Sequence, residues 1–183
     1  MASGKSQLGR RLSSLLGCKL YDTDTCIEQR TGMSVSEIFA KKGEHWFREE
    51  ESRLIRNLPD EDCVVVTGGG LPCQHGNMEY IRLHGAAVYV EVSERTLVQR
   101  LQKPENQAGR PLLKDMPSEE ISFFVKNKLK EREYFYKQAG HCFRPEEEDF
   151  NSLLQWARKL FLAGSPEKSK MRMLEKPGQP CKK

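Results

Sequence analysis

The sequence contains no apolar run long enough to span a membrane and no internal repeat. Its N-terminus also lacks the basic segment, hydrophobic stretch and small-residue cleavage site of a secretory signal. Charged residues make up 31% of the chain and the mean hydropathy is −0.68, which is typical of a solvated surface. We therefore expect a cytoplasmic protein without a membrane partner.

The six cysteines include no C-x-x-C pair, the spacing that zinc ribbons and redox motifs use. Their scattered positions give no sign of a disulfide framework either. Reduced and mostly buried thiols are the simpler interpretation.

A basic folded surface is lacking as well. The formal charge is +4, and the whole excess lies in residues 165–183, whereas the rest of the chain is neutral. A nucleic-acid-binding domain carries its basic residues on the folded part, so we expect no nucleic-acid partner. A length of 183 residues suits one domain. We place it at residues 1–164 and expect the basic tail 165–183 to be disordered because it has almost no aliphatic content.

The front half of a phosphate-binding loop is missing. Gly4-Lys5-Ser6 matches the end of the pattern G-x-x-x-x-G-K-[ST], in which backbone N–H groups and the lysine hold phosphates and the serine reaches Mg²⁺. Residues 1–3 occupy spacer positions. We expect Met1 to be an internal residue of a longer natural sequence, with the first loop glycine and a central strand before it. Gly-Lys-Ser alone is a weak signal, because it also occurs by chance where helices begin.

The rest of the chain alternates helical and extended patterns. Helical spacing, N-cap residues and glycine stops predict helices over residues 5–16, 35–42, 44–58, 78–83, 94–101, 118–138 and 149–162. Apolar runs predict strands over residues 18–21, 63–67, 86–92 and 141–143. The run 63–67 lacks polar alternation, which indicates a strand buried on both faces of a parallel sheet. The alternation predicts an α/β fold, and the polar stretch 103–116 is a candidate lid.

Two carboxylates follow the first predicted strand. Asp22 and Asp24 are two residues apart, so on an extended segment both side chains point to the same side. One could hold metal-bound water while the other orients or deprotonates an attacking hydroxyl, as phosphoryl transfer requires. Each of them alone is more simply interpreted as an N-cap or turn residue of a helix near Thr25.

Glycines and arginines supply further candidates. Three glycines, residues 68–70, directly follow a predicted buried strand, where the backbone could approach a polyol closely; a flexible connection is the alternative. Arg48 and Arg132 lie on predicted helices, where most arginines only form solvated faces, but together they could clamp a carboxylate. Arg110, in the lid, could meet phosphates on closure.

Taken in order, these stretches resemble the shikimate kinase family. The matching pieces are Gly4-Lys5-Ser6, Asp22-Thr23-Asp24, Gly43-Glu44 through Phe47-Arg48-Glu49, Thr67-Gly68-Gly69-Gly70, Arg110-Pro111-Leu112-Leu113, and Glu131-Arg132 with Tyr134 and Tyr136. The resemblance covers about residues 2–162. It implies a three-layer α/β/α fold like that of nucleoside monophosphate kinases, here without its central first strand. It also implies ATP-dependent phosphorylation of the 3-hydroxyl of shikimate in chorismate and aromatic amino-acid biosynthesis.

The resemblance further implies a role for individual residues. Asp24 would be the base that orients the shikimate hydroxyl, with Lys5 and Arg110 as further catalytic residues. Shikimate would be bound by Asp24, Arg48, Gly69, Gly70 and Arg132. ATP would be bound by Ala2, Ser3, Gly4, Lys5, Ser6, Gln7, Arg100, Arg110 and Arg144, of which Arg100 and Arg144 would pack near adenine. Mg²⁺ would be bound by Ser6 and Asp22. A monomer is expected.

Two alternatives stay open. A gluconate-type kinase would use the same phosphate loop for another polyol, and a non-catalytic remnant of a nucleotide-binding fold would bind a partner through its basic tail. A missing central strand would leave buried backbone groups unpaired at a cost of about 1–3 kcal/mol each. We therefore expect this chain to be poorly active or unstable.

Overall fold

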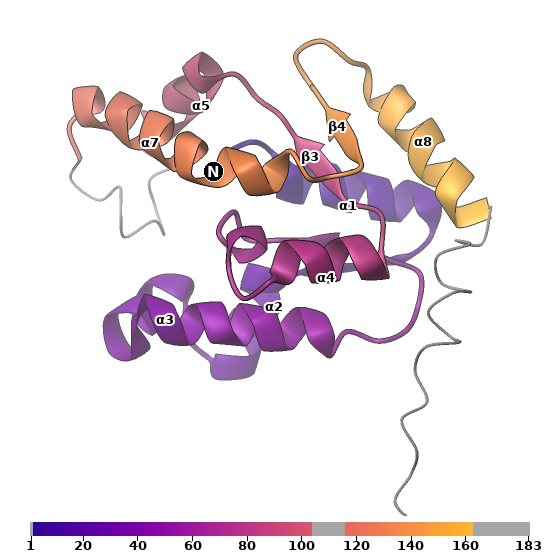
Figure 1. Cartoon of the computed structure of the whole chain (residues 1–183), viewed down its shortest axis with the longest axis horizontal. Coiled ribbons are helices and arrows are strands. Elements are labelled where there is room, and N and C mark those ends of the chain that lie inside the picture. Colours follow the sequence, from indigo (N-terminus) through magenta and orange to yellow (C-terminus); the bar gives the residue numbers. More distant parts are fainter. Residues whose placement is uncertain (1, 104–115, 163–183) are drawn as a thin grey trace, which may run out of the picture.

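The computed structural model describes residues 2–103 and 116–162. Arg110, nearly all of the predicted lid and the predicted tail 165–183 lie outside the described residues. The elements alternate as an α/β fold requires, which confirms the predicted class (Figure 1). In chain order they are α1 (Lys5–Leu16), β1 (Lys19–Asp22), α2 (Thr23–Thr31), α3 (Val35–Arg56), β2 (Cys63–Val66), the 3-10 helix η1 (Leu71–Cys73), α4 (Asn77–His84), β3 (Val88–Val90), α5 (Glu94–Leu101), α7 (Ser118–Tyr136), β4 (His141–Phe143) and α8 (Phe150–Leu162).

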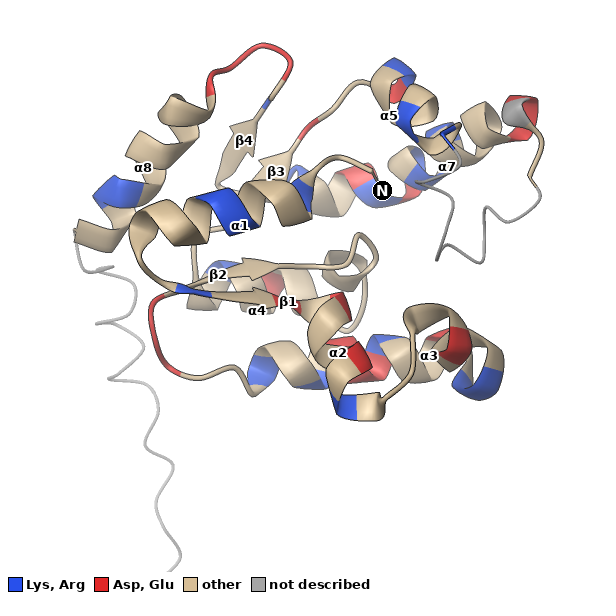
Figure 2. Cartoon of the chain, turned by 180° about the vertical axis from the view of Figure 1, so that it is seen from behind, with Lys and Arg blue, Asp and Glu red and all other residues tan. Residues whose placement is uncertain are grey.

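The four described strands form two parallel pairs rather than one sheet. β1 pairs with β2, with Lys19 opposite Cys63 at the start of the register. β3 pairs with β4, with Val88 opposite His141. In Figure 2, α1 crosses the view between the pair β3–β4 above it and the pair β1–β2 below it. Both pairs are parallel, which confirms the predicted parallel arrangement.

β2 is less buried than its sequence indicates. Only Val66 in this strand is buried, and Val65 is 36% exposed. The prediction of a strand buried on both faces is therefore wrong for this chain. The physical reason is that a two-stranded sheet provides too little neighbouring structure to cover both faces of β2.

α1 lies directly against the pair β1–β2. Gly9 is the point of contact: a methyl group there would overlap Val66 Cγ2 and lie 3.3 Å from Leu20 Cδ1. The absence of a side chain thus lets the helix axis approach the strands closely. Because α1 begins at Lys5, this contact fixes the phosphate-loop residues next to the carboxyl ends of β1 and β2.

Two apolar clusters build separate cores. Ile27, Ile38 and Phe47 join α2 to α3. A second cluster joins α5 to α7 and consists of Val92, Leu97, Leu101, Ile121 and Val125. The candidate arginines therefore lie on helices of different cores. Arg48 is on α3, whereas Arg100 and Arg132 are on α5 and α7.

Local signals set most element boundaries. The capping box of Ser34 and Glu37 begins α3 as predicted. The two helices predicted on either side of Gly43 form α3, which is kinked where Gly43 takes φ 83° and ψ 163°. β3 spans three residues and is shorter than the predicted strand 86–92. None of the described helices is long and apolar enough to cross a membrane.

Candidate active site

One cavity of about 830 Å³ opens at the N-terminus of α1 and the carboxyl ends of β1 and β2. Open α/β sheets bind ligands at this edge. Most of the predicted site residues line it: Ala2, Ser3, Gly4, Lys5, Ser6, Gln7, Asp22, Asp24, Arg48, Gly69, Gly70, Arg100 and Arg132. Arg144 is not among the lining residues, whereas the neighbouring Pro145 is. Arg144 instead forms an ion pair with Glu91 at 2.6 Å.

Gly4 and the first turn of α1, which begins at Lys5, form an anion-binding site, here called the phosphate corner. Gly4 is the N-cap in the left-handed conformation, with φ 87°, and the first turn contains no acidic residue. The N–H groups of such a turn and the positive end of the helix dipole attract phosphate. Arg100 Nη1 donates to the carbonyl oxygen of Ala2 at 3.0 Å. This contact ties α5 to the loop and places the Arg100 guanidinium near the phosphate corner.

Ser6 and Asp22 lie side by side at the edge of this corner. The Ser6 hydroxyl donates to Asp22 Oδ2 at 2.8 Å. Asp22 is also the N-cap of α2, since its Oδ1 accepts from the Thr25 N–H at 3.4 Å. The N-cap interpretation is thus confirmed, and it leaves the second carboxylate oxygen at Ser6. Neighbouring hydroxyl and carboxylate oxygens fit the ligand preference of Mg²⁺, which takes its other ligands from water and phosphate.

Asp24 lies in the first turn of α2 rather than on an extended segment. The argument that strand geometry sends Asp22 and Asp24 to one side is therefore wrong, because Asp22 caps a helix that begins at Thr23. Both residues line the cavity nevertheless. Asp24 Oδ1 is buried and has no hydrogen-bond partner among the described residues. Burial raises the pKa of Asp24 and so does Asp22, while Lys5 and Arg48 lower it. An unpartnered carboxylate oxygen of raised basicity can accept a proton from a bound hydroxyl.

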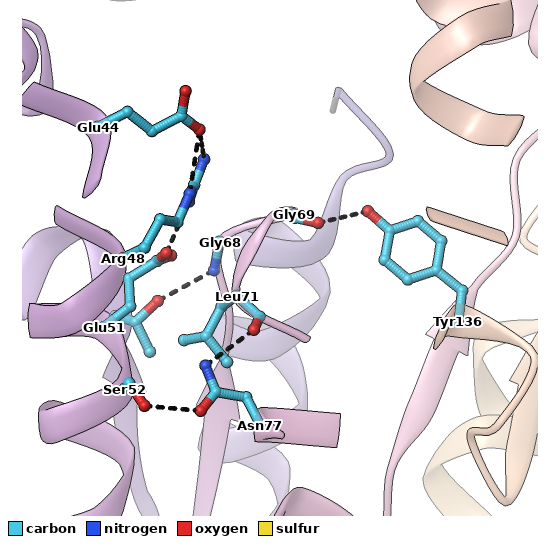
Figure 3. A network of polar contacts seen from close by, with 10 residues as sticks. Glu44, Arg48, Glu51, Ser52, Gly68, Gly69, Leu71, Asn77 and Tyr136 are labelled. Carbon is cyan, nitrogen blue, oxygen red and sulfur yellow. Dashed lines mark hydrogen bonds and ion pairs between the residues drawn. The ribbon is translucent and has the colours of Figure 1, made fainter. Parts of the chain in front are cut away.

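Arg48 is held by two glutamates (Figure 3). Its Nε and Nη2 donate to Glu44 Oε1 at 3.1 and 2.7 Å, and its Nη1 donates to Glu51 Oε2 at 2.6 Å. The Glu51 side chain is fully buried. Burial raises the pKa of Glu51 to about 7, although Arg48 acts in the opposite direction. The guanidinium also packs against residues 68–70, here called the glycine turn. A methyl group on Gly70 would lie 2.6 Å from Arg48 Cζ.

Buried polar groups hold the glycine turn and the residues that follow it in place. The Gly68 N–H donates to Thr23 Oγ1 at 3.0 Å. Asn77 Nδ2 donates to the carbonyl oxygen of Leu71 at 2.9 Å, and Asn77 Oδ1 accepts from the Ser52 hydroxyl at 2.9 Å (Figure 3). Asn77 is completely buried. These contacts hold the segment after β2 against α3, so the turn is not a loose connection.

Sequence reasoning missed the residues that support the site. Glu44 and Glu51 had a usable signal, because they lie four residues before and three residues after Arg48 on a predicted helix. Asn77 had none, since its partners come from α3 and η1 and its sequence neighbours carry no recognisable motif.

A phosphate corner on a helix N-terminus, a neighbouring hydroxyl–carboxylate pair, and a buried carboxylate that shares its cavity with two arginines define a P-loop kinase that acts on a small anionic molecule. The family model for shikimate kinase matches residues 1–159. The chain therefore belongs to the shikimate kinase family.

Individual relatives support this assignment. The chain is 38% identical over 147 residues to the shikimate kinase of Parabacteroides distasonis, which covers 80% of this chain and 84% of that protein. It resembles the crystal structure of the Bacteroides thetaiotaomicron enzyme with a TM-score of 0.77 and 32% identity, over 88% of this chain and 93% of that one. The Acinetobacter baumannii enzyme in complex with shikimate matches with a TM-score of 0.73 and 31% identity, over 91% and 90%.

Proposed function

We infer that the chain catalyses the ATP-dependent phosphorylation of the 3-hydroxyl of shikimate, a step in aromatic amino-acid biosynthesis. One observation carries this inference beyond family membership. Asp24, Arg48 and Arg132 line the same cavity as the phosphate corner at Lys5. A molecule that has both a carboxylate and a hydroxyl group can therefore reach the arginines and the phosphate at once.

In the proposed site, Arg48 and Arg132 bind the carboxylate of shikimate, since guanidinium groups pair with carboxylates through two parallel hydrogen bonds. The backbone at Gly69 and Gly70 contacts the ring hydroxyls. Asp24 orients the 3-hydroxyl and takes its proton as the oxygen forms a bond to the γ-phosphorus and ADP leaves. The buried position and raised pKa of Asp24 suit this role.

The phosphates of ATP lie at the first turn of α1 in this proposal. Ala2, Ser3, Gly4 and Gln7 surround them, and Lys5 contacts the β- and γ-phosphates. Arg100, on α5, adds positive charge there. Its hydrogen bond to the Ala2 carbonyl oxygen keeps the guanidinium near the loop. Arg110 and Arg144 remain proposed ATP contacts by resemblance alone. Ser6 and Asp22 would hold Mg²⁺, which neutralises charge on the transferred phosphoryl group.

We further propose that the protein is a monomer in a reducing cytoplasm. The cysteines within residues 2–103 and 116–162 are free thiols, which supports a compartment that keeps thiols reduced. None of them is buried, so the prediction of mostly buried thiols is wrong. Size-exclusion chromatography with light scattering tests the monomer, and a mass near 42 kDa instead of the 21.1 kDa of one chain would contradict it.

A substrate panel tests the reaction. ADP release is measured with shikimate, with gluconate and with neither, using the chain as it stands and its Asp24→Asn variant. We expect release that depends on shikimate and falls at least a hundredfold in Asp24→Asn, because the proton acceptor is lost. Calorimetry should find shikimate bound to that variant within a few-fold of the parent affinity. ADP release with gluconate but not with shikimate would favour the gluconate-type kinase. No ADP release with either compound, together with no shikimate binding, would favour a non-catalytic remnant.

A further inference from the structure

Tyr136 connects two parts of the cavity wall that come from different cores. It lies at the end of α7, one helical turn after Arg132, so the two side chains share a face. Its ring packs against Tyr89 of β3, with ring centroids 5.2 Å apart. Its hydroxyl donates to the carbonyl oxygen of Gly69 at 2.6 Å (Figure 3). Tyr136 thus reaches from α7 to the turn that follows β2.

The Tyr136 hydroxyl lies close enough to Arg132 for the positive charge of the guanidinium to act on it. The carbonyl oxygen of Gly69 can only accept, so the tyrosine proton goes to Gly69. Burial raises the pKa of Tyr136, although Arg132 acts to lower it. The phenol therefore keeps its proton at neutral pH and remains a donor to Gly69.

The glycine turn is consequently held between Arg48 and α7, the helix that carries Arg132. On one side Arg48 abuts Gly70, where an added methyl group would lie 2.6 Å from its Cζ. On the other side the Tyr136 hydroxyl bonds Gly69 to α7, the helix that carries Arg132 one turn earlier. Two residues of backbone and one hydroxyl thus connect the Arg48 guanidinium of α3 to the helix that positions Arg132.

We propose that Tyr136 is a positioning residue that sets the spacing of Arg48 and Arg132, and through it the affinity for the carboxylate of shikimate. The proposal rests on the proposed function, in which both arginines bind that carboxylate. Tyr136 is not among the residues that line the cavity, so it acts through Arg132 and Gly69 rather than by touching the substrate.

The variant Tyr136→Phe tests this role because it removes the hydroxyl and keeps the ring against Tyr89. We expect the KM for shikimate to rise about five- to tenfold, as for the loss of a buried hydrogen bond. The kcat and the KM for ATP should stay within twofold of the parent. Tyr134→Phe is the matched control, since Tyr134 on the same helix is 75% exposed, and it should leave all three parameters unchanged.

Two results would overturn the proposal. One is a KM for shikimate that stays within twofold of the parent in Tyr136→Phe. The other is a fall in kcat matched by an equal rise in the KM values for shikimate and ATP, together with a lowered Tm. That result would mean that the hydroxyl only supports the fold.

A double-mutant cycle with Arg132→Lys gives a second measurement. If Tyr136 acts through Arg132, the lysine substitution should raise the KM for shikimate much more in the parent than in Tyr136→Phe. Effects that multiply independently would refute the proposal. A parent chain without shikimate-dependent ADP release would refute the proposed function and this inference with it, whereas an active parent with an unaffected Tyr136→Phe refutes only the inference.

Discussion

At the scale of single residues, Arg48 is held by two glutamates before substrate binds. Glu44 and Glu51 accept its hydrogen bonds, and Gly70 leaves room for its guanidinium. Its side chain is only 13% exposed. A guanidinium held in this way loses little conformational freedom when it binds a carboxylate, which favours affinity.

Gly70 should therefore tolerate no side chain. In Gly70→Ala the methyl group would lie 2.6–2.7 Å from Arg48 Cζ, Nη1 and Nη2, and the glutamate partners prevent an easy shift of the guanidinium. We expect the KM for shikimate to rise about tenfold or more, with a smaller change in the KM for ATP. Steady-state kinetics measure both. Gly140→Ala is the matched control, because a methyl group there meets nothing within 4 Å among the described residues; an equal rise in that variant would contradict the explanation.

Glu51 should make stability depend on pH. Its pKa in the folded chain is about 7, above the ordinary value of 4.5, so the folded state binds this proton more tightly than the unfolded state. The contribution is complete at low pH and is lost as the pH rises through 7. Between pH 5 and 8 the free energy of unfolding of the parent should fall by about 1–3 kcal/mol relative to Glu51→Gln.

Urea unfolding of both proteins at several pH values measures this difference. Glu44→Gln is the control, since Glu44 is the exposed partner of Arg48 and its side chain is 55% exposed. A difference between parent and Glu51→Gln that stays constant from pH 5 to 8 would show that Glu51 carries its charge throughout.

At the scale of elements, the sequence predicts best where the signal is local. The helical spacing of α1 and the capping box of α3 are contained in a few neighbouring residues, and both elements form as expected. The segment at Asp22 shows the limit. Whether Asp24 continues a strand or begins a helix depends on the competition between β1 pairing and capping by Asp22, and the cap prevails.

The contact between α1 and β2 leads to a test of packing against helix propensity. Replacing Gly9 by Ala should favour the isolated helix by up to about 1 kcal/mol. In the folded chain, however, the methyl group would overlap Val66 Cγ2. We expect overpacking to dominate and Gly9→Ala to lower the free energy of unfolding by about 1–3 kcal/mol. Ser14→Ala, at an exposed position of the same helix, should cause no loss. Equal stability of the two variants in urea unfolding would refute close packing at Gly9.

At the scale of the whole molecule, the site lies where two separately cored parts meet. Most lining residues follow from a resemblance in sequence, because phosphate loops and ordered motifs are local. The residues that support the site could not be predicted in this way. Tyr136 contacts Gly69 across 67 positions of sequence, and Asn77 contacts Ser52 across 25. Such contacts depend on how distant elements pack, which no local pattern specifies. The same holds for the exposure of Val65, because β2 has one strand neighbour, β1, among the described residues.

The division of the strands into two pairs has a consequence for heat stability. Each pair has its own backbone ladder, and no strand among the described residues connects them. A shikimate molecule held by Arg48 on one side and Arg132 on the other would be a non-covalent bridge between the parts, so the ligand would serve as a component of the fold. At a hundred times its Kd it should add about 2.7 kcal/mol to the free energy of unfolding and raise the Tm by roughly 5–10 °C. Shikimate methyl ester, which lacks the charge, should give a much smaller rise in a thermal scan, and an equal rise would show that the carboxylate forms no bridge.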